Sequence, residues 1–281
     1  MPSQKPLRRW ELPKSPADKL GLCVFVFGGL FLLWYEALHI LPTYYPDDAE
    51  SSSMKYVHYV AALVFAFNIY GNMFLLITTD ISGRHLVFPS GPSQDGWIYC
   101  EKSQCNIPAR AHYCKLCQIL VLRRDHHCWF AGYCVGYHNH RYYIAMVTYI
   151  TLAALYCNIF NASFVFQVKN GITFLNLLSF IGPQFGLLFG YFTLYEFFIT
   201  LLSTIGFILF VLFSWLLEIQ IVQIFNGQTR YERKMNIKDY NMGLKQNITE
   251  LLGKRWYFVF LFPWIPCELP GDGLSFQMKG K

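Results

Sequence analysis

Four long runs of apolar residues restrict the fold of this 281-residue chain more than any other feature of its sequence. The first run is interrupted only by Glu36 and His39, and the last only by Glu196 and Glu218. A membrane-spanning helix needs about 20 predominantly apolar residues. Three of the runs therefore predict one span each, and the fourth has room for one span and a surface segment, or for two spans. The runs cover residues 20–41, 57–77, 143–166 and 172–225.

The composition excludes a water-soluble globular domain of this length. Hydrophobic residues make up 54% of the chain and aromatic residues 19%. Charged residues make up only 14%, whereas a soluble domain carries about 25%. Intrinsic disorder is excluded as well, because it requires few aromatic residues and a high net charge. The chain is thus predicted to be a polytopic membrane protein.

The 23 Lys and Arg residues are distributed unevenly between these runs. Five precede residue 20, seven lie in 78–142 and nine follow residue 225, whereas each of the two remaining loops holds one. Under the positive-inside rule, the N-terminus, the middle segment and the C-terminal tail face the cytosol.

This sidedness requires an even number of crossings between the middle segment and the tail. It favours four spans over five, with the last span within 197–221. The stretch 172–191, which Gly182 and Pro183 interrupt, would then lie at the far membrane face or dip into the membrane and return.

The cysteines are concentrated in the middle segment, where six of the nine fall within 35 residues. Disulfides are rare in the cytosol, so clustered cysteines there indicate metal binding or catalysis. Cys114 and Cys117 have the spacing of a ligand pair for one tetrahedral zinc ion. Two further ligands are needed, and His127 and Cys134 are the best placed.

The tetrad Asp125-His126-His127-Cys128 within this segment resembles the signature of the DHHC family of protein S-acyltransferases. The resemblance extends to Arg110, four residues before Cys114, and to the spacing from Cys128 through Cys134 to Asn139. Further similar motifs occur in the tail, carried by Thr229, Glu232 and Asn247. The tail motif departs from the family pattern at Arg230, where the family has a second threonine.

The resemblance implies a protein S-acyltransferase, or palmitoyltransferase. Cys128 would take a fatty acyl group from palmitoyl-CoA or a similar acyl-CoA and pass it to a cysteine of a cytosolic or membrane protein. The implied partners are this acyl-CoA, proteins with membrane-proximal cysteines and the lipid bilayer, with no nucleic acid. Arg123 and Arg124 are candidates for binding the CoA phosphates, although arginines near a membrane also bind lipid headgroups.

The chemistry of the tetrad agrees with that role. A free thiol is mostly protonated at cytosolic pH, so an acyl-accepting Cys128 needs a nearby base. His126 lies two residues earlier and would supply it, and Asp125 would orient the imidazole and stabilise its cationic form. A zinc-bound His127 would fix the backbone between base and nucleophile.

The chain departs from the family at the first of the two zinc sites that the resemblance implies. Cys100 stands in register, but the other three ligand positions are occupied by Ser103, Tyr113 and Leu120. Cys105 and His112 lie one or two residues out of register, and using them would still leave a ligand missing. Structural zinc almost always takes four ligands. We therefore expect one zinc ion rather than two.

An alternative function follows from these departures. Losing a structural ion could loosen the segment, and Trp129 and Phe130 replace the family's usual Pro-Trp after the nucleophile. A catalytically impaired, zinc-stabilised membrane adaptor of the same fold therefore remains open. It predicts that Cys128 is dispensable while Cys114 is not.

The predicted fold is an all-α polytopic membrane protein with four transmembrane helices. A small zinc-stabilised cytosolic domain lies between helices two and three, and both termini are cytosolic. An endomembrane location, the Golgi or the endoplasmic reticulum, is expected. His138 and His140 are expected at the surface. The predicted segments are the N-terminal segment 1–19, helices one and two in 20–77, the cysteine-rich domain 78–142, helices three and four in 143–225, and the tail 226–281.

Overall fold

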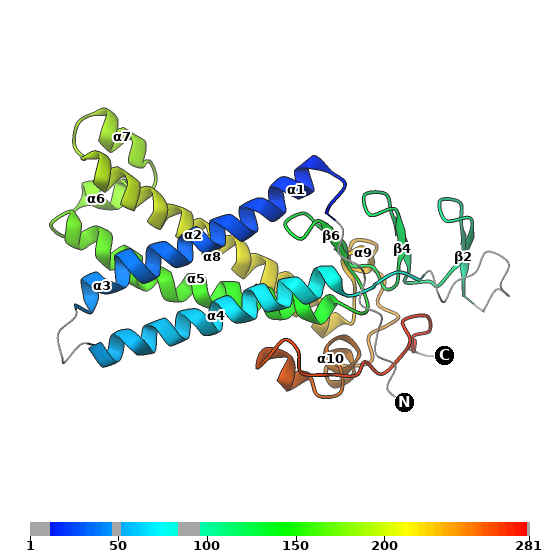
Figure 1. The fold of residues 1–281 in the computed structure, drawn as a ribbon. Helices are drawn as coiled ribbons and strands as arrows, with labels where there is room; N and C mark the ends of the chain where they lie inside the picture. Colours follow the sequence, from blue (N-terminus) through cyan, green and yellow to red (C-terminus); the bar gives the residue numbers. More distant parts are fainter. Residues whose placement is uncertain (1–11, 47–51, 84–95, 280–281) are drawn as a thin grey trace. The chain divides into compact units, whose positions relative to one another are not determined.

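The computed structural model describes residues 12–46, 52–83 and 96–279, and Figure 1 draws their helices and strands. Residues 1–11 and 84–95 lie outside the described residues. The prediction that Arg8, Arg9 and Arg84 face the cytosol therefore falls on residues that the structure does not describe.

Four helices are long and apolar enough to cross a membrane. The shortest has 26 residues, which at about 1.5 Å per residue exceeds the ~30 Å hydrocarbon core of a bilayer. The prediction of four membrane helices is confirmed. The four candidate spans are Pro16–Tyr44, Ser53–Thr78, His140–Val168 and Leu194–Asn226.

The first span is not a uniform α-helix. Two five-residue stretches of wider, π-helical hydrogen bonding interrupt it, a feature common at functional sites in α-helices. Its parts are α1 (Pro16–Cys23), the π-helical Val24–Gly28, α2 (Gly29–Tyr35), the π-helical Glu36–Ile40 and α3 (Leu41–Tyr44). The other three spans are formed by α4 (Ser52–Thr78), α5 (His140–Val168) and α8 (Leu194–Asn226).

Two short helices, α6 (Phe174–Leu178) and α7 (Pro183–Leu188), occupy the stretch between α5 and α8. They have five and six residues, or about 8–9 Å each, and neither can cross a bilayer. Lys169 at the end of α5 donates to Ser179 Oγ at 2.8 Å. The second half of the fourth apolar run thus supplies the last span, and the first half forms these helices.

Three antiparallel hairpins follow α4 and add short strands to a fold predicted as all-α. Each strand has three residues, too short for the alternation of polar and apolar residues to identify it in a sequence. The pairs are β1 (Ile98–Cys100) with β2 (Cys105–Ile107), β3 (His112–Cys114) with β4 (Ile119–Val121), and β5 (His126–Cys128) with β6 (Tyr133–Val135).

The tail contains α9 (Arg230–Lys234), α10 (Leu244–Leu252) and a 3₁₀ helix, Trp256–Phe260. It packs on the start of α5 through a buried apolar cluster. The cluster contains Ile144, Ala145, Leu251, Leu252, Val259 and Cys267.

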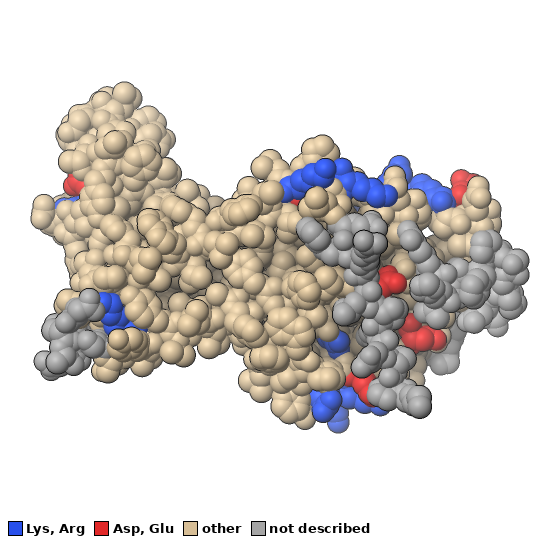
Figure 2. Space-filling model, viewed as in Figure 1, with Lys and Arg blue, Asp and Glu red and all other residues tan. Residues whose placement is uncertain are grey.

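The chain divides into two compact units. The first consists of the described parts of Met1–Gly29, Asn68–Met146 and Glu218–Lys281 and contains all three hairpins. The second consists of the described parts of Leu30–Phe67 and Val147–Leu217. In Figure 2 the charged side chains in view lie mostly over the first unit. Tyr35, Ile40, Phe164, Val165 and Ile199 form a buried apolar cluster in the second unit.

Candidate active site and metal centre

The β5–β6 hairpin determines which way the residues of the tetrad face. Successive side chains of a strand point to opposite faces, so His126 and Cys128 share one face and His127 lies on the other. His127 is paired across the hairpin with Cys134. This local geometry separates a candidate base and nucleophile from a candidate metal ligand one residue away.

Four side chains on the His127 face converge to form a group able to hold a metal ion. Cys114 ends β3, Cys117 follows in the turn, and His127 and Cys134 come from β5 and β6. Their ligand atoms all lie within 4.8 Å of one another. Nδ1 of His127 lies 3.3 Å from Sγ of Cys117 and 3.7 Å from each of the other two sulfurs.

Three thiols and one imidazole are a zinc ligand set. Bonds of about 2.3 Å to sulfur and 2.0–2.1 Å to nitrogen in a tetrahedron place neighbouring ligand atoms roughly 3.5–3.8 Å apart. The distance between Sγ of Cys117 and Sγ of Cys134, 3.7 Å, lies in this range. The donor set and its spacing therefore fit zinc.

On the other face, Nδ1 of His126 donates to Oδ2 of Asp125 at 2.8 Å. Asp125 is fully buried at its side chain, and its second oxygen accepts from Gln223 Nε2 at 2.9 Å and from the backbone of Arg230 at 2.8 Å. Burial alone would raise the pKa of this carboxyl, but the His140 and His126 imidazoles hold it well below its ordinary value. An ionised Asp125 leaves Nε2 of His126 as the basic nitrogen.

The thiol of Cys128 is buried, because the residue is only 2% exposed. Burial, the largest influence on this group, raises its pKa to about 12. A thiol with so high a pKa is a poor nucleophile by itself, so a proton acceptor is needed. The ring of His126 packs edge-on against Tyr143 at a centroid distance of 4.8 Å.

The expectation that His140 lies at the surface is wrong, because it is only 1% exposed. Its Nε2 lies 2.7 Å from Oε1 of Gln220 and 3.9 Å from Oδ2 of Asp125. His140 is the first residue of α5, and Gln220 of α8 contacts it from 80 residues away in the chain.

The three tail residues noted in the sequence have defined structural contacts. Oγ1 of Thr229 accepts from the backbone of Glu232 at 3.3 Å, and Glu232 Oε2 accepts from the Thr229 amide at 2.8 Å, which forms a capping box at α9. Asn247 donates to the carbonyls of Ile224 and Phe225 at the end of α8. The capping box fixes the start of α9, and the Asn247 bonds tie the tail to the last turn of α8.

Arg110 joins the tail to the hairpins. It is 1% exposed, and both oxygens of Glu232 accept from its guanidinium, at 2.7 and 2.8 Å. Glu250 accepts a third bond at 3.0 Å, and the rings of Tyr240 and Phe276 lie 4.2 and 4.7 Å from the guanidinium carbon. A buried arginine is tolerated where its donors are paired in this way.

The two arginines considered for CoA binding have different surroundings. Arg123 is 3% exposed, and its Nε lies 3.4 Å from an oxygen of Glu250. Arg124 is only partly buried and interacts with the sulfurs of Cys134 and Cys114, which raise its pKa against the opposing effect of burial.

The region of the missing zinc site contains apolar side chains. Cys105 and Leu120 belong to a buried cluster with Tyr137, which Cys100 and Phe276 cover. His112 packs on Tyr231 at a ring distance of 4.4 Å, away from the cysteines. No second metal-binding group is found among the described residues. Cys100 and Cys105 are paired across the β1–β2 hairpin, but neither they nor His112 belong to a metal-binding group among the described residues.

Glu250, Gln223 and Asp18 belong to this site and were not recognised in the sequence. Asp18 lies 3.1 Å from Nε2 of His127, across 109 residues of chain. None of the three stands in a motif with its partner, and a lone acidic or amide residue in a tail or helix gives no signal of its own.

Four membrane helices and a cysteine-rich segment with a zinc ligand set between the second and third define a class: multi-pass membrane proteins that carry an Asp-His-His-Cys site beside a candidate metal centre. The family model described as DHHC palmitoyltransferase matches residues 93–237. The chain belongs to this family.

Several curated proteins are similar over most of the chain. A probable palmitoyltransferase ZDHHC24 of Danio rerio is 34% identical over 223 residues, 79% of this chain and 76% of the relative. The protein of the same name from Rattus norvegicus is 31% identical, with 75% and 74% covered. A palmitoyltransferase ZDHHC22 of Mus musculus is 29% identical, with 69% and 76% covered.

Proposed function

We propose that this chain is an active protein S-acyltransferase that carries a palmitoyl or similar acyl group on Cys128. The observation that carries the proposal is the 2.8 Å contact between Asp125 and His126. His126 lies on strand β5, which places its side chain on the same face as that of Cys128. An ionised carboxylate beside a histidine beside a cysteine is the arrangement that activates a thiol for acyl transfer.

The proposed reaction is a pair of thioester exchanges. His126 accepts the proton of the Cys128 thiol, the sulfur attacks the carbonyl of the acyl-CoA, and the bond to the CoA sulfur breaks, so CoA leaves as a thiol after taking the proton. His126 then accepts the proton of a substrate cysteine thiol, the substrate sulfur attacks the acyl-Cys128 carbonyl, and the bond to Sγ of Cys128 breaks, so Cys128 leaves as a thiol after taking that proton from His126. No oxidant or reductant is needed, and the thioester is conserved in both steps.

We infer that one zinc ion is held by Cys114, Cys117, His127 and Cys134. When bound, it supplies a structural link between the β3–β4 turn and the β5–β6 hairpin. The apolar cluster around Cys105 and Leu120 supports a count of one, because a packed core occupies the region where a second ion would need four ligands. The same cluster weakens the case for a destabilised adaptor, since packing takes over the stabilising role there.

The topology follows from the basic residues. The N-terminus, the hairpins and the tail are assigned to the cytosol, in a Golgi or endoplasmic-reticulum membrane. Substrate proteins would present cysteines close to the membrane, where the acyl chain of the donor lies. For the CoA phosphates, Arg124 is the better placed of the two arginines, because Arg123 is already paired with Glu250.

The test is labelling of purified full-length protein with radiolabelled palmitoyl-CoA. Wild type should form an acyl adduct that hydroxylamine removes, and Cys128→Ser should form none. Cys23→Ser, which changes an exposed cysteine of α1, is the matched control and should label like wild type. Equal labelling of wild type and Cys128→Ser would refute the proposal, and a function retained in cells by Cys128→Ser but lost by Cys114→Ser would favour the adaptor.

A further inference from the structure

The N-terminal helix α1 makes a direct contact with the metal centre. Oδ2 of Asp18 lies 3.1 Å from Nε2 of His127. Asp18 is 4% exposed although it stands in the first turn of a helix near the start of the chain. An aspartate so deeply buried needs a hydrogen-bond donor, and the imidazole of His127 provides one.

The two nitrogens of His127 face different partners. Nδ1 faces the three sulfurs, at 3.3 to 3.7 Å, and Nε2 faces the carboxylate. A carboxylate can only accept a hydrogen bond, so the ring proton lies on Nε2 and the lone pair of Nδ1 is directed at the cluster. Metal-binding histidines are commonly held in this way by a carboxylate on the far nitrogen.

Close packing around Asp18 keeps this geometry in place. Gly132, at φ +59°, approaches Pro13 so closely that an added Cβ would lie 2.3 Å from Cγ of that proline. Gly21 lies equally tightly against Trp129, the residue after Cys128, where a Cβ would be 2.7 Å from the backbone oxygen. The two glycines therefore let residues 13–21 lie directly on the loop that follows Cys128.

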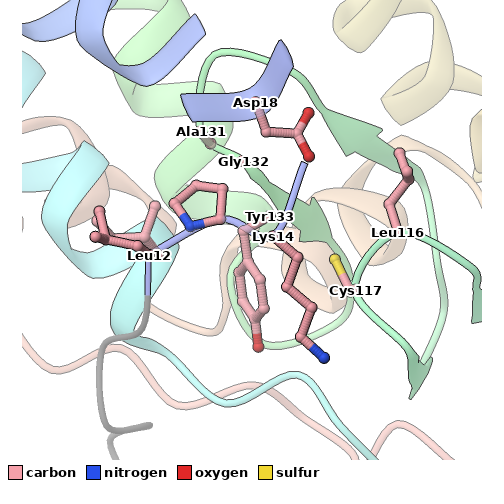
Figure 3. A pocket seen from close by; sticks show the side chains of 10 residues that line it. Leu12, Lys14, Asp18, Leu116, Cys117, Ala131, Gly132 and Tyr133 are labelled. Atoms are coloured by element: carbon pink, nitrogen blue, oxygen red, sulfur yellow. The ribbon is translucent and has the colours of Figure 1, made fainter. Parts of the chain in front are cut away.

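A second contact of the same segment reaches the turn that carries Cys117. Nζ of Lys14 donates to Oε1 of Gln118 at 2.6 Å. Figure 3 shows Lys14, Asp18, Cys117 and Gly132 around one small cavity of about 30 Å³. Residues 13–21 therefore contact both the turn that carries Cys117 and the strand that carries His127. Within this segment, Asp18 is the residue that contacts a ligand side chain, the imidazole of His127.

We propose that Asp18 is a positioning residue of the metal centre: its carboxylate fixes the tautomer and orientation of His127 and so ties the first membrane helix to the strand that carries Cys128. The inference rests on the zinc assignment of the proposed function. It gives the N-terminal helix a role in metal retention beyond crossing the membrane.

The test is the zinc dissociation constant of the purified full-length protein in detergent, measured by competition with a chromophoric chelator. Asp18→Ala should weaken zinc binding by about 10- to 100-fold, the usual effect of losing such a partner. Asp18→Asn should lose less, because the amide oxygen still accepts a hydrogen bond from Nε2. Asp18→Asn also tests the proposal if Asp18→Ala does not fold.

Three controls separate positioning from general packing. Lys14→Ala removes the neighbouring contact of the same segment, and Glu101→Gln neutralises an exposed carboxylate on the β1–β2 turn; both should stay within about twofold of wild type. The decisive control is His127→Cys, which replaces the imidazole by a fourth thiolate ligand. In that background Asp18→Ala should no longer weaken zinc binding, because the bond it removes is already absent.

An equal loss of zinc affinity from Asp18→Ala in both backgrounds would overturn the proposal, and so would no loss in either. A wild-type protein that retains no zinc would instead refute the zinc assignment of the proposed function, and this proposal with it. The acyl-adduct assay measures whether Cys128 is acylated. It therefore tests the catalytic part of the proposed function independently of zinc affinity.

Discussion

The backbone N–H of Arg230 donates a hydrogen bond of 2.8 Å to Oδ1 of Asp125, 105 residues earlier in the chain. Arg230 is the first residue of α9, so the start of a tail helix holds the carboxylate that contacts His126. Arg230 is also the position at which the tail motif departs from the family pattern. Because the contact uses the backbone, the departure does not remove it.

This arrangement predicts a contrast between two substitutions of Arg230. Arg230→Ala keeps the amide and should leave the rate of acyl-Cys128 formation within about twofold of wild type. Arg230→Pro should lower it by about 10- to 100-fold, since a hydrogen bond to a charged group is worth ~1.5–3 kcal/mol. Proline is tolerated at the first position of a helix, and Thr229 before it is already extended. Single-turnover acylation measures both, and equal rates would contradict the account.

The buried Arg110 predicts a large effect on stability. Arg110→Ala leaves Glu232 and Glu250 without their shared cation and should destabilise the protein by about 3–5 kcal/mol, the usual cost of an uncompensated buried charge. Thermal unfolding in detergent checks this. The control is Arg233→Ala, an exposed residue of the same helix α9, which should change stability by less than ~0.5 kcal/mol. Similar unfolding of the two variants would show that the buried pair is not stabilising.

Glu232 predicts how stability depends on pH. Burial opposes ionisation of this carboxyl, but the hydrogen bonds and charge of Arg110 lower its pKa below the ordinary value of 4.5. As the pH falls, the carboxyl of the unfolded chain takes up its proton near pH 4.5. The carboxyl of the folded protein does so only at a lower pH. The stabilisation is therefore present above pH 4.5 and is lost as the pH falls through the lower folded value. Glu232→Gln should be less stable than wild type at pH 7, and the difference should shrink on acidification below 4.5. A difference that grows would contradict the assignment.

The apolar cluster predicts that packing, and not a second metal ion, stabilises the region around Cys105 and Leu120. Leu120→Ala should destabilise the protein by about 2–5 kcal/mol, as expected for a buried leucine, and leave zinc at one ion per chain. Cys105→Ser should likewise leave the zinc content unchanged, whereas Cys117→Ser should abolish it. Metal analysis of the purified variants tests this. Two zinc ions in the wild-type protein, one of them lost in Cys105→Ser, would contradict this account and show that the first zinc site binds metal.

The sequence predicts what depends on local spacing. The four spans follow from run length together with the distribution of basic residues, and Cys114, Cys117, His127 and Cys134 follow from the interval between ligands within one segment. The contacts of Asp18 with His127 and of Arg110 with Glu250 join residues 109 and 140 positions apart. No sequence pattern within a single segment predicts these two contacts. The burial of His140 escaped prediction for the same reason, because α8 covers it from 80 residues away.

The central claim is that the acyl group is carried on Cys128, and the most direct measurement is peptide mass spectrometry of the wild-type protein after a brief reaction with palmitoyl-CoA. We predict an acyl group on the peptide that contains Cys128, formed as CoA is released and lost when a cysteine-containing acceptor is added. An adduct on another cysteine that is lost to the acceptor while Cys128 stays unmodified, or transfer to the acceptor with no acyl-enzyme, would contradict the account.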